Sequence, residues 1–153
     1  MFRKDASMRQ VFLSYAHPDG ALAEALAADL KKRGLSVWSH DAELLPGDNV
    51  WLRNGEALKK SEAMVVLVSP EAMRSEWVQS EIEYALGNRN YEGKLFPVQV
   101  RPTPSMPWIL REFKILDAKQ GVDKIGEAIA SALRHERPRS LSIRWAKPKP
   151  AKL

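Results

Sequence analysis

Hydrophobic residues in this chain form two alternating patterns, short continuous runs and helical stripes. The continuous runs have the length and composition of β-strands and lie at residues 11–15, 35–40, 63–69, 94–100 and 113–118. Four segments carry apolar residues at i, i+3 and i+4, as helices with one buried face do, at residues 19–34, 50–63, 75–88 and 121–136. This alternation predicts an open α/β sheet of five parallel strands with helices on both faces.

Residues at the ends of the predicted elements support their boundaries. Asp19 and Ser75 are placed to cap the first and third helices through a side-chain oxygen. Gly34 stands where the first helix should end, and Gly55 weakens the second helix. The run at 65–68 is apolar on both faces, which is typical of a central strand in a parallel sheet.

Ligands bind to such sheets outside the carboxyl ends of the strands. The loops expected at that edge span residues 15–20, 39–49, 69–76 and 101–107. Trp77 and Glu81 follow the third of these loops at i and i+4, so they share one face of the third helix. By spacing alone, the pair is either part of a ligand site at the rim of a cleft or a half-buried Trp beside a solvated Glu. Trp51 is expected to anchor the second helix in the core.

Composition restricts the chemistry that this domain can perform. The 153 residues are 44% hydrophobic, enough for one core, and the absence of Cys excludes disulfides and thiol nucleophiles. The three His are scattered without metal-ligand spacing, so no metal site is expected. The N-terminal segment lacks the apolar run of a signal peptide and no run approaches the length of a membrane span, so we expect a cytoplasmic protein.

The net charge of +5 is concentrated near the C-terminus. Residues 134–153 carry seven Lys or Arg and one Glu, whereas the rest of the chain carries 17 basic and 18 acidic residues. This Pro-containing segment is expected to be a solvated tail, with contact to nucleic acid, an acidic partner or a membrane surface as the alternatives. The body has no basic stripe with interleaved aromatics, so no nucleic-acid partner is predicted. We predict an N-terminal extension at 1–9, one domain at 10–136 and a basic, flexible tail at 137–153.

Several enzyme signatures are absent. The chain has no GxGxxG after the first strand, no GxxxxGK[ST] and no GxSxG, which argues against a standard dinucleotide-binding enzyme, a P-loop NTPase and an esterase. A phosphoacceptor domain of the response-regulator type needs acidic residues where this chain has Ser14, Tyr15 and Ser69.

What remains is a carboxylate beside an indole ring. A carboxylate stabilises the positive charge of an oxocarbenium-like transition state, and an aromatic ring suits stacking on nicotinamide or adenine. Because nicotinamide attached to ribose is already cationic, it leaves without a general acid, so a single carboxylate suffices.

Four motifs carry a family resemblance: "VFLSYAH", "LLPGD", "VVLVSP" and "SEWVQSE". Together they make residues 10–117 resemble a TIR (Toll/interleukin-1 receptor) domain of the bacterial type. The resemblance implies a flavodoxin-like parallel sheet, in agreement with the hydrophobic pattern. Members of this family either cleave NAD+ or act as adaptors that signal by assembly.

The resemblance implies an NAD+ glycohydrolase or cyclase that releases nicotinamide and forms ADP-ribose or a cyclic ADP-ribose isomer, with NAD+ as substrate and no cofactor. Glu81 takes the place of the family's catalytic Glu and Trp77 that of the Trp in the W-x-x-x-E pattern. Small members of this kind serve bacterial antiphage signalling, where a separate effector senses the product. Adaptor-type members typically lack this Glu; the alternative is a non-enzymatic interaction module or an effector that mimics host TIR domains.

Further site residues are implied by the matching loops. Tyr15, Ala16 and His17 match a loop that contacts the substrate, although His17 is as easily an exposed residue without function. His40 stands where many members have an Asp, and the Asp of this chain comes one place later, at Asp41. Either the loop is shifted by one residue, or His40 makes the polar contact, or His40 is a solvated loop residue.

The loop with Pro46, Gly47 and Asp48 matches the BB loop, which gates the site and contacts neighbouring subunits, and Asp48 is also expected to contact substrate. A domain with short loops needs a second protomer to enclose a dinucleotide. Head-to-tail contacts of this kind extend into filaments. We therefore expect an isolated protein that is mostly monomeric, weakly active and activated by self-association.

Overall fold

The computed structural model describes residues 9–40 and 44–135. It contains one sheet of five parallel strands in the order β2-β1-β3-β4-β5. The strands are β1 (Gln10–Ser14), β2 (Ser36–Trp38), β3 (Ala63–Val68), β4 (Leu95–Gln99) and β5 (Leu116–Asp117). β1 begins one residue before its predicted run, the other four lie within theirs, and β5 is at an edge, so the predicted sheet is confirmed. The predicted tail, and the predicted extension apart from Arg9, lie outside the described residues.

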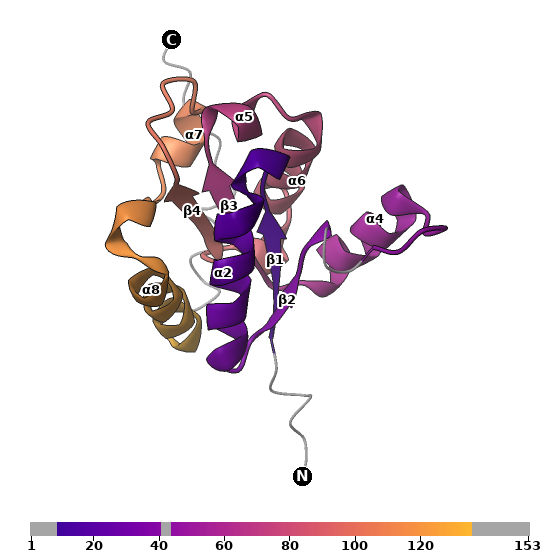
Figure 1. Ribbon diagram of the computed structural model, residues 1–153, viewed down its shortest axis with the longest axis horizontal. Coiled ribbons are helices and arrows are strands. Elements are labelled where there is room, and N and C mark those ends of the chain that lie inside the picture. Colours follow the sequence, from indigo (N-terminus) through magenta and orange to yellow (C-terminus); the bar gives the residue numbers. More distant parts are fainter. Residues whose placement is uncertain (1–8, 41–43, 136–153) are drawn as a thin grey trace.

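Helices cover both faces of the sheet, as predicted. They are α2 (Gly20–Lys32), α4 (Val50–Lys60), α5 (Pro70–Met73), α6 (Glu76–Leu86), α7 (Trp108–Arg111) and α8 (Val122–Arg134), with 3-10 turns η1 (His17–Asp19), η2 (Arg89–Tyr91) and η3 (Ala118–Gln120). Helices α2 and α8 pack together over one face, while α4, α5, α6 and α7 build the core on the other (Figure 1).

The two faces follow from the alternation of side chains along the strands. In β1, Val11 and Leu13 join the core cluster under α2 and α8, whereas Phe12 joins the cluster under α4 and α6. All six residues of β3 are buried, which explains its continuous apolar run.

Helix α4 projects from the β2 side of the molecule (Figure 1). Its buried face is short and consists of Asn54, Ala57 and Leu58. Its first residues, Val50, Trp51 and Leu52, are exposed. The predicted core anchor at Trp51 is therefore wrong, because the N-terminal end of α4 lies beyond the sheet and has no core beneath it.

Side-chain caps begin three of the helices. Ser75 accepts a hydrogen bond from the backbone N–H of Val78, as predicted, and Ser69 and Asn49 cap α5 and α4 in the same way. The predicted cap at Asp19 is wrong in its chemistry. Asp19 stands at the N-cap position of α2 but makes no side-chain cap bond there, because its backbone is not extended and its carboxylate turns inward.

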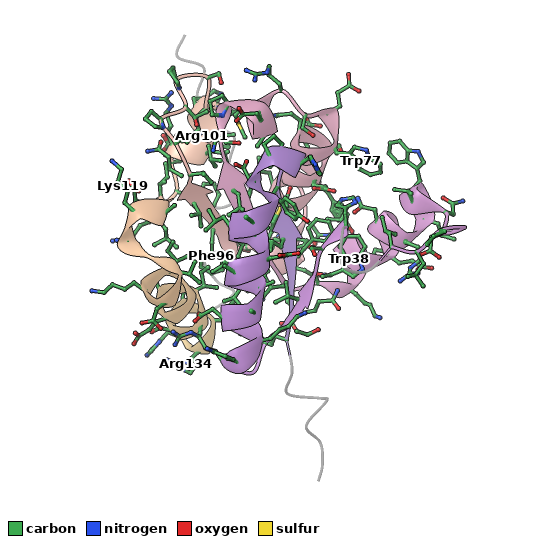
Figure 2. All side chains as sticks on the ribbon, viewed as in Figure 1. Trp38, Trp77, Phe96, Arg101, Lys119 and Arg134 are labelled. Carbon is green, nitrogen blue, oxygen red and sulfur yellow. The ribbon has the colours of Figure 1, made fainter. Side chains whose placement is uncertain are left out.

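The Asp19 carboxylate instead joins three loops at the carboxyl edge of the sheet. It accepts hydrogen bonds from Ser69 Oγ at 2.6 Å and from Arg101 Nη2 at 3.1 Å. Arg101, at this end of the sheet in Figure 2, also binds the carboxylate of Glu71, and this hydrogen bond lowers the pKa of Glu71. The segments after β1, β3 and β4 are thus held together around one buried acid.

Tyr91 fastens the C-terminal end of α4 to the core. Its side chain is fully buried and its hydroxyl donates to the Leu58 carbonyl at 2.6 Å, and burial raises the pKa of Tyr91. The Leu58 carbonyl is one of the last four of its helix, which lack partners within the helix.

We expect Tyr91→Phe to lower the free energy of unfolding by about 1–3 kcal/mol, because it leaves this buried carbonyl without its donor. Urea denaturation measures the loss, and the Tm should fall by several degrees. Tyr84→Phe is the matched control, since Tyr84 packs edge-on against the Tyr91 ring at 6.1 Å and is less buried. Equal stability of both variants would contradict a structural role for the Tyr91 hydroxyl.

Candidate functional site

Glu81 is the buried polar centre of the face that α4 and α6 cover. Its side chain is 1% exposed, and its carboxylate accepts three hydrogen bonds. Ser14 Oγ donates to Oε1 at 2.7 Å, while His40 Nε2 and Asn54 Nδ2 donate to Oε2 at 3.0 and 3.1 Å. The donors come from the end of β1, the segment after β2 and helix α4, so they are far apart in sequence.

This burial corrects the expectation of a carboxylate at the rim of a cleft and excludes the solvated alternative. Glu81 lies on the face of α6 that carries Val78 and Ile82, and all three side chains are buried. A buried carboxylate is costly unless donors replace its water. Ser14, His40 and Asn54 supply those donors, and because a carboxylate only accepts, His40 Nε2 carries the proton of its hydrogen bond.

Trp77, one turn before Glu81 on α6, projects toward α4 (Figure 2). Its ring stacks on Trp51, with centroids 4.4 Å apart and planes at 27°. The His40 ring meets Trp77 edge-on at 5.3 Å and Trp38 edge-on at 5.2 Å. An aromatic row therefore runs from the core to the surface, where Trp51 is 73% exposed.

His40 forms a hydrogen bond with Glu81 inside the protein, and a contact between His40 and substrate stays a prediction. Its ring is held between the indoles and the Glu81 carboxylate, so the solvated reading is wrong. Asp41 lies outside the described residues, and the shift of the loop by one residue stays a hypothesis.

The loop after β1 brings only part of the predicted set to Glu81. Tyr15 packs against the core cluster under α2 and α8, on the opposite side of the sheet from Glu81. Ala16 is buried in the cluster on the same side as Glu81, and His17 is exposed in η1. Ser14 makes the contact instead, because successive residues of a strand point to opposite faces. A substrate contact for Tyr15, Ala16 or His17 stays a prediction.

The loop before α4 is organised around Asp48. Its carboxylate accepts from the Leu45 N–H at 2.7 Å and from Arg53 Nη1 at 3.2 Å, so these bonds stay within the loop and the helix it precedes. Pro46 and Gly47 are exposed, and Gly47 has φ of 94°. The turn is therefore well placed for contact with another molecule, and a substrate contact by Asp48 stays a prediction.

Ser14 and Asn54 are site residues that the sequence analysis missed. Asn54 occupies a position of the α4 stripe, with Ala57 and Leu58 at i+3 and i+4, where an apolar residue is expected. A polar residue on a buried stripe was the signal that could have found it. Ser14 has a weaker signal, a hydroxyl at the end of a buried strand.

Neither a metal site nor a membrane-spanning helix is present in residues 9–40 and 44–135. No group of three or more His, Asp or Glu in this part of the chain could hold a metal ion. Within the same ranges, no helix has the length and apolarity to cross a membrane.

The five-stranded parallel sheet, with a buried carboxylate on the helix after its central strand and a Trp one turn before that carboxylate, makes this a flavodoxin-like α/β domain. The family model described as TIR domain matches residues 11–134, so the chain belongs to the TIR domain family. The TIR domain of the Toll-related receptor TRR-2 from Hydra magnipapillata has the same fold, with a TM-score of 0.63 at 19% identity over 90% of this chain and 98% of that one.

Two relatives are named as NAD(+) hydrolases. The chain is 36% identical over 150 residues, 89% of its length, to NAD(+) hydrolase ApTIR of Actinoplanes sp.. It is 31% identical over 138 residues, 85% of its length, to NAD(+) hydrolase TcpA of a Theionarchaea archaeon. These matches cover 19% and 42% of the two relatives, so the chain corresponds to a part of each.

The Trp51–Trp77 stack can be tested without any substrate. Two stacked indoles give exciton coupling in the far-ultraviolet circular dichroism spectrum, and we expect Trp51→Ala to abolish it while lowering stability by only about 0.5–1.5 kcal/mol. Trp108→Ala on α7 is the control, since Trp108 is also exposed, at 52%, but lies on another helix. A couplet that survives Trp51→Ala would show that the two rings do not stack in solution.

Proposed function

We propose that this chain is an NAD+ glycohydrolase or cyclase with Glu81 as its catalytic residue. The observation that supports this most directly is the carboxylate itself, which is held by three donors beside Trp77 in a TIR domain. The names of the two NAD(+) hydrolase relatives agree with it. NAD+ is the substrate, and the reaction requires no cofactor.

The proposed chemistry follows from the charge of the substrate. The bond between ribose C1′ and the nicotinamide nitrogen breaks, and its electron pair neutralises the pyridinium, so nicotinamide leaves without a proton. The ribose becomes oxocarbenium-like, and the negative Glu81 carboxylate stabilises that charge. Water then adds to C1′ and loses a proton to give ADP-ribose; capture by a nucleophile within the same molecule gives a cyclic isomer. Trp77 provides an aromatic face for a base.

In this proposal the described conformation is a resting one. Glu81 is 1% exposed, and His40, which is 21% exposed, lies on its outer oxygen. Substrate reaches the carboxylate after His40 and the N-terminal end of α4 move outward. Trp51 moves with that end of the helix and uncovers the face of Trp77 on which it stacks.

Self-association is the proposed trigger for this movement. Leu45, Val50, Trp51 and Leu52 expose apolar side chains around the turn at Gly47, and exposed apolar groups of this kind mark interaction sites. A second copy seated on them stabilises an open position of α4 and supplies part of the wall around the dinucleotide. A role in antiphage signalling with a separate effector belongs to the same proposal and rests on the family resemblance. Filament formation, expected from head-to-tail contacts, and a cytoplasmic location are parts of the proposal too.

Glu81→Gln tests the carboxylate. We expect nicotinamide release to fall by a factor on the order of 100 or more, because the charge that stabilises the cationic transition state is lost. Glu83→Gln, an exposed change of the same kind on the same helix, should retain wild-type activity. The Tm is measured in parallel, because an amide at residue 81 turns its NH2 toward one of the three donors. Retained cleavage by a folded Glu81→Gln protein would remove Glu81 from the mechanism.

A dilution series tests the trigger. Nicotinamide release per mole of protein should rise with concentration over about a hundredfold range, in parallel with light scattering. Gly47→Val should suppress the rise, because φ of 94° strains a β-branched residue in the exposed turn. Gly93→Val is the control, with φ of 75° in the turn before β4 and comparable strain.

Three results would contradict parts of this proposal. A flat, high specific activity in a monomeric sample would show that one chain holds a complete site. A normal rise in the Gly47→Val protein would remove that turn from assembly. The absence of cleavage at every concentration would favour the non-enzymatic interaction module.

A further inference from the structure

Asn54 contains a buried acceptor that has no partner among the described residues. The side chain is 4% exposed, its Nδ2 donates to Glu81 Oε2 at 3.1 Å, and its Oδ1 makes no hydrogen bond. The orientation of the amide follows from chemistry, since a carboxylate accepts and the reverse orientation would place two oxygens together. Buried acceptors without partners are rare in native proteins and need an explanation.

We propose that Asn54 has two functions at this site: its Nδ2 positions the Glu81 carboxylate, and its Oδ1 accepts a hydrogen bond from a hydroxyl of the nicotinamide ribose of NAD+. This inference rests on the proposed function and adds to it a residue that determines substrate specificity.

The number of open acceptors fits a sugar diol. A carboxylate has about four lone-pair sites, and three are used, with Oε1 bound only by Ser14. Glu81 Oε1 and Asn54 Oδ1 are therefore the acceptors with remaining capacity. A ribose presents two neighbouring hydroxyl donors on one rigid ring, which matches two acceptors on side chains that are joined by the bond from Asn54 Nδ2 to Glu81 Oε2.

The helix geometry ties this acceptor to the movement that admits substrate. Trp51 and Asn54 are three residues apart on α4, and Trp77 and Glu81 are four apart on α6. The two helices thus meet through two pairs, the indole stack and the amide–carboxylate bond. When the N-terminal end of α4 moves outward, Oδ1 is uncovered together with the carboxylate and the Trp77 ring.

Asn54→Leu separates this role from a structural one. Leucine has nearly the same size and favours helix, and it removes both the open acceptor and the donor. We expect an unchanged or higher Tm, because a buried unsatisfied oxygen is lost, with nicotinamide release reduced about 10- to 100-fold. Gly55→Ala is the control on the next residue of α4, where an added Cβ meets nothing within 4 Å, and it should retain full activity. A lower Tm with wild-type activity at low temperature would overturn the proposal.

Substrate analogues test the hydrogen bond itself. The wild type and Asn54→Leu are assayed with NAD+ and with analogues that lack the 2′- or the 3′-hydroxyl of the nicotinamide ribose. The differing intrinsic reactivity of the analogues cancels when the two proteins are compared. We expect the preference of the wild type for NAD+ over one analogue to shrink about tenfold or more in the variant. Equal preferences in the two proteins would overturn the inference.

A binding measurement keeps the two proposals distinguishable. If the wild type releases no nicotinamide, the proposed function fails, and calorimetric titration of NAD+ into both proteins still tests Asn54. Weaker binding of NAD+ to Asn54→Leu than to the wild type supports the proposed hydrogen bond between the ribose and Asn54 Oδ1. Equal affinities for the two proteins, or no binding to either, would overturn it.

Discussion

The burial of the Glu81 carboxylate is the constraint on which this site depends. A carboxylate with 1% exposure needs donors in place of water, and the chain supplies them from β1, from His40 after β2 and from α4. Each donor fixes the position of the element that carries it relative to α6. Removing a donor therefore disturbs the carboxylate, because the contacts that pack this face also set the geometry of the site.

The same contacts hold the carboxylate and cover it. His40 and Asn54 share Oε2, and the indole stack of Trp51 on Trp77 lies farther out. The contacts that shield the Glu81 carboxylate from water therefore also block the approach of a substrate. The balance is set at the N-terminal end of α4, which has exposed apolar side chains and little core beneath it. Segments with few buried contacts are those that open at low free-energy cost, so α4 is better suited to move than α6.

Predictions from the sequence were correct where a feature depends on residues of one segment, and wrong where it depends on which other segment packs against it. The stripe of α6 and its Ser75 cap were predicted correctly, as were the five parallel strands. The rim position of Glu81 and the core position of Trp51 were wrong, because helix periodicity does not say what the next helix covers. Asp19 stands at the start of α2, yet its carboxylate binds Ser69, fifty residues away in sequence.

The sequence by itself determined the order of strands and helices along the chain, the parallel sheet, and the proximity of Trp77 and Glu81 on one helix. Residue spacing and the alternation of elements decide these features locally. The four sequence motifs indicated membership of the TIR domain family. Only the tertiary structure decided that Ser14, His40 and Asn54 converge on one carboxylate, that Tyr15 faces away from it, and that Asn54 keeps an open acceptor. These features depend on how α4 packs against α6 across the end of the sheet. That packing minimises the cost of burying a charge over the whole face, and no single segment specifies it.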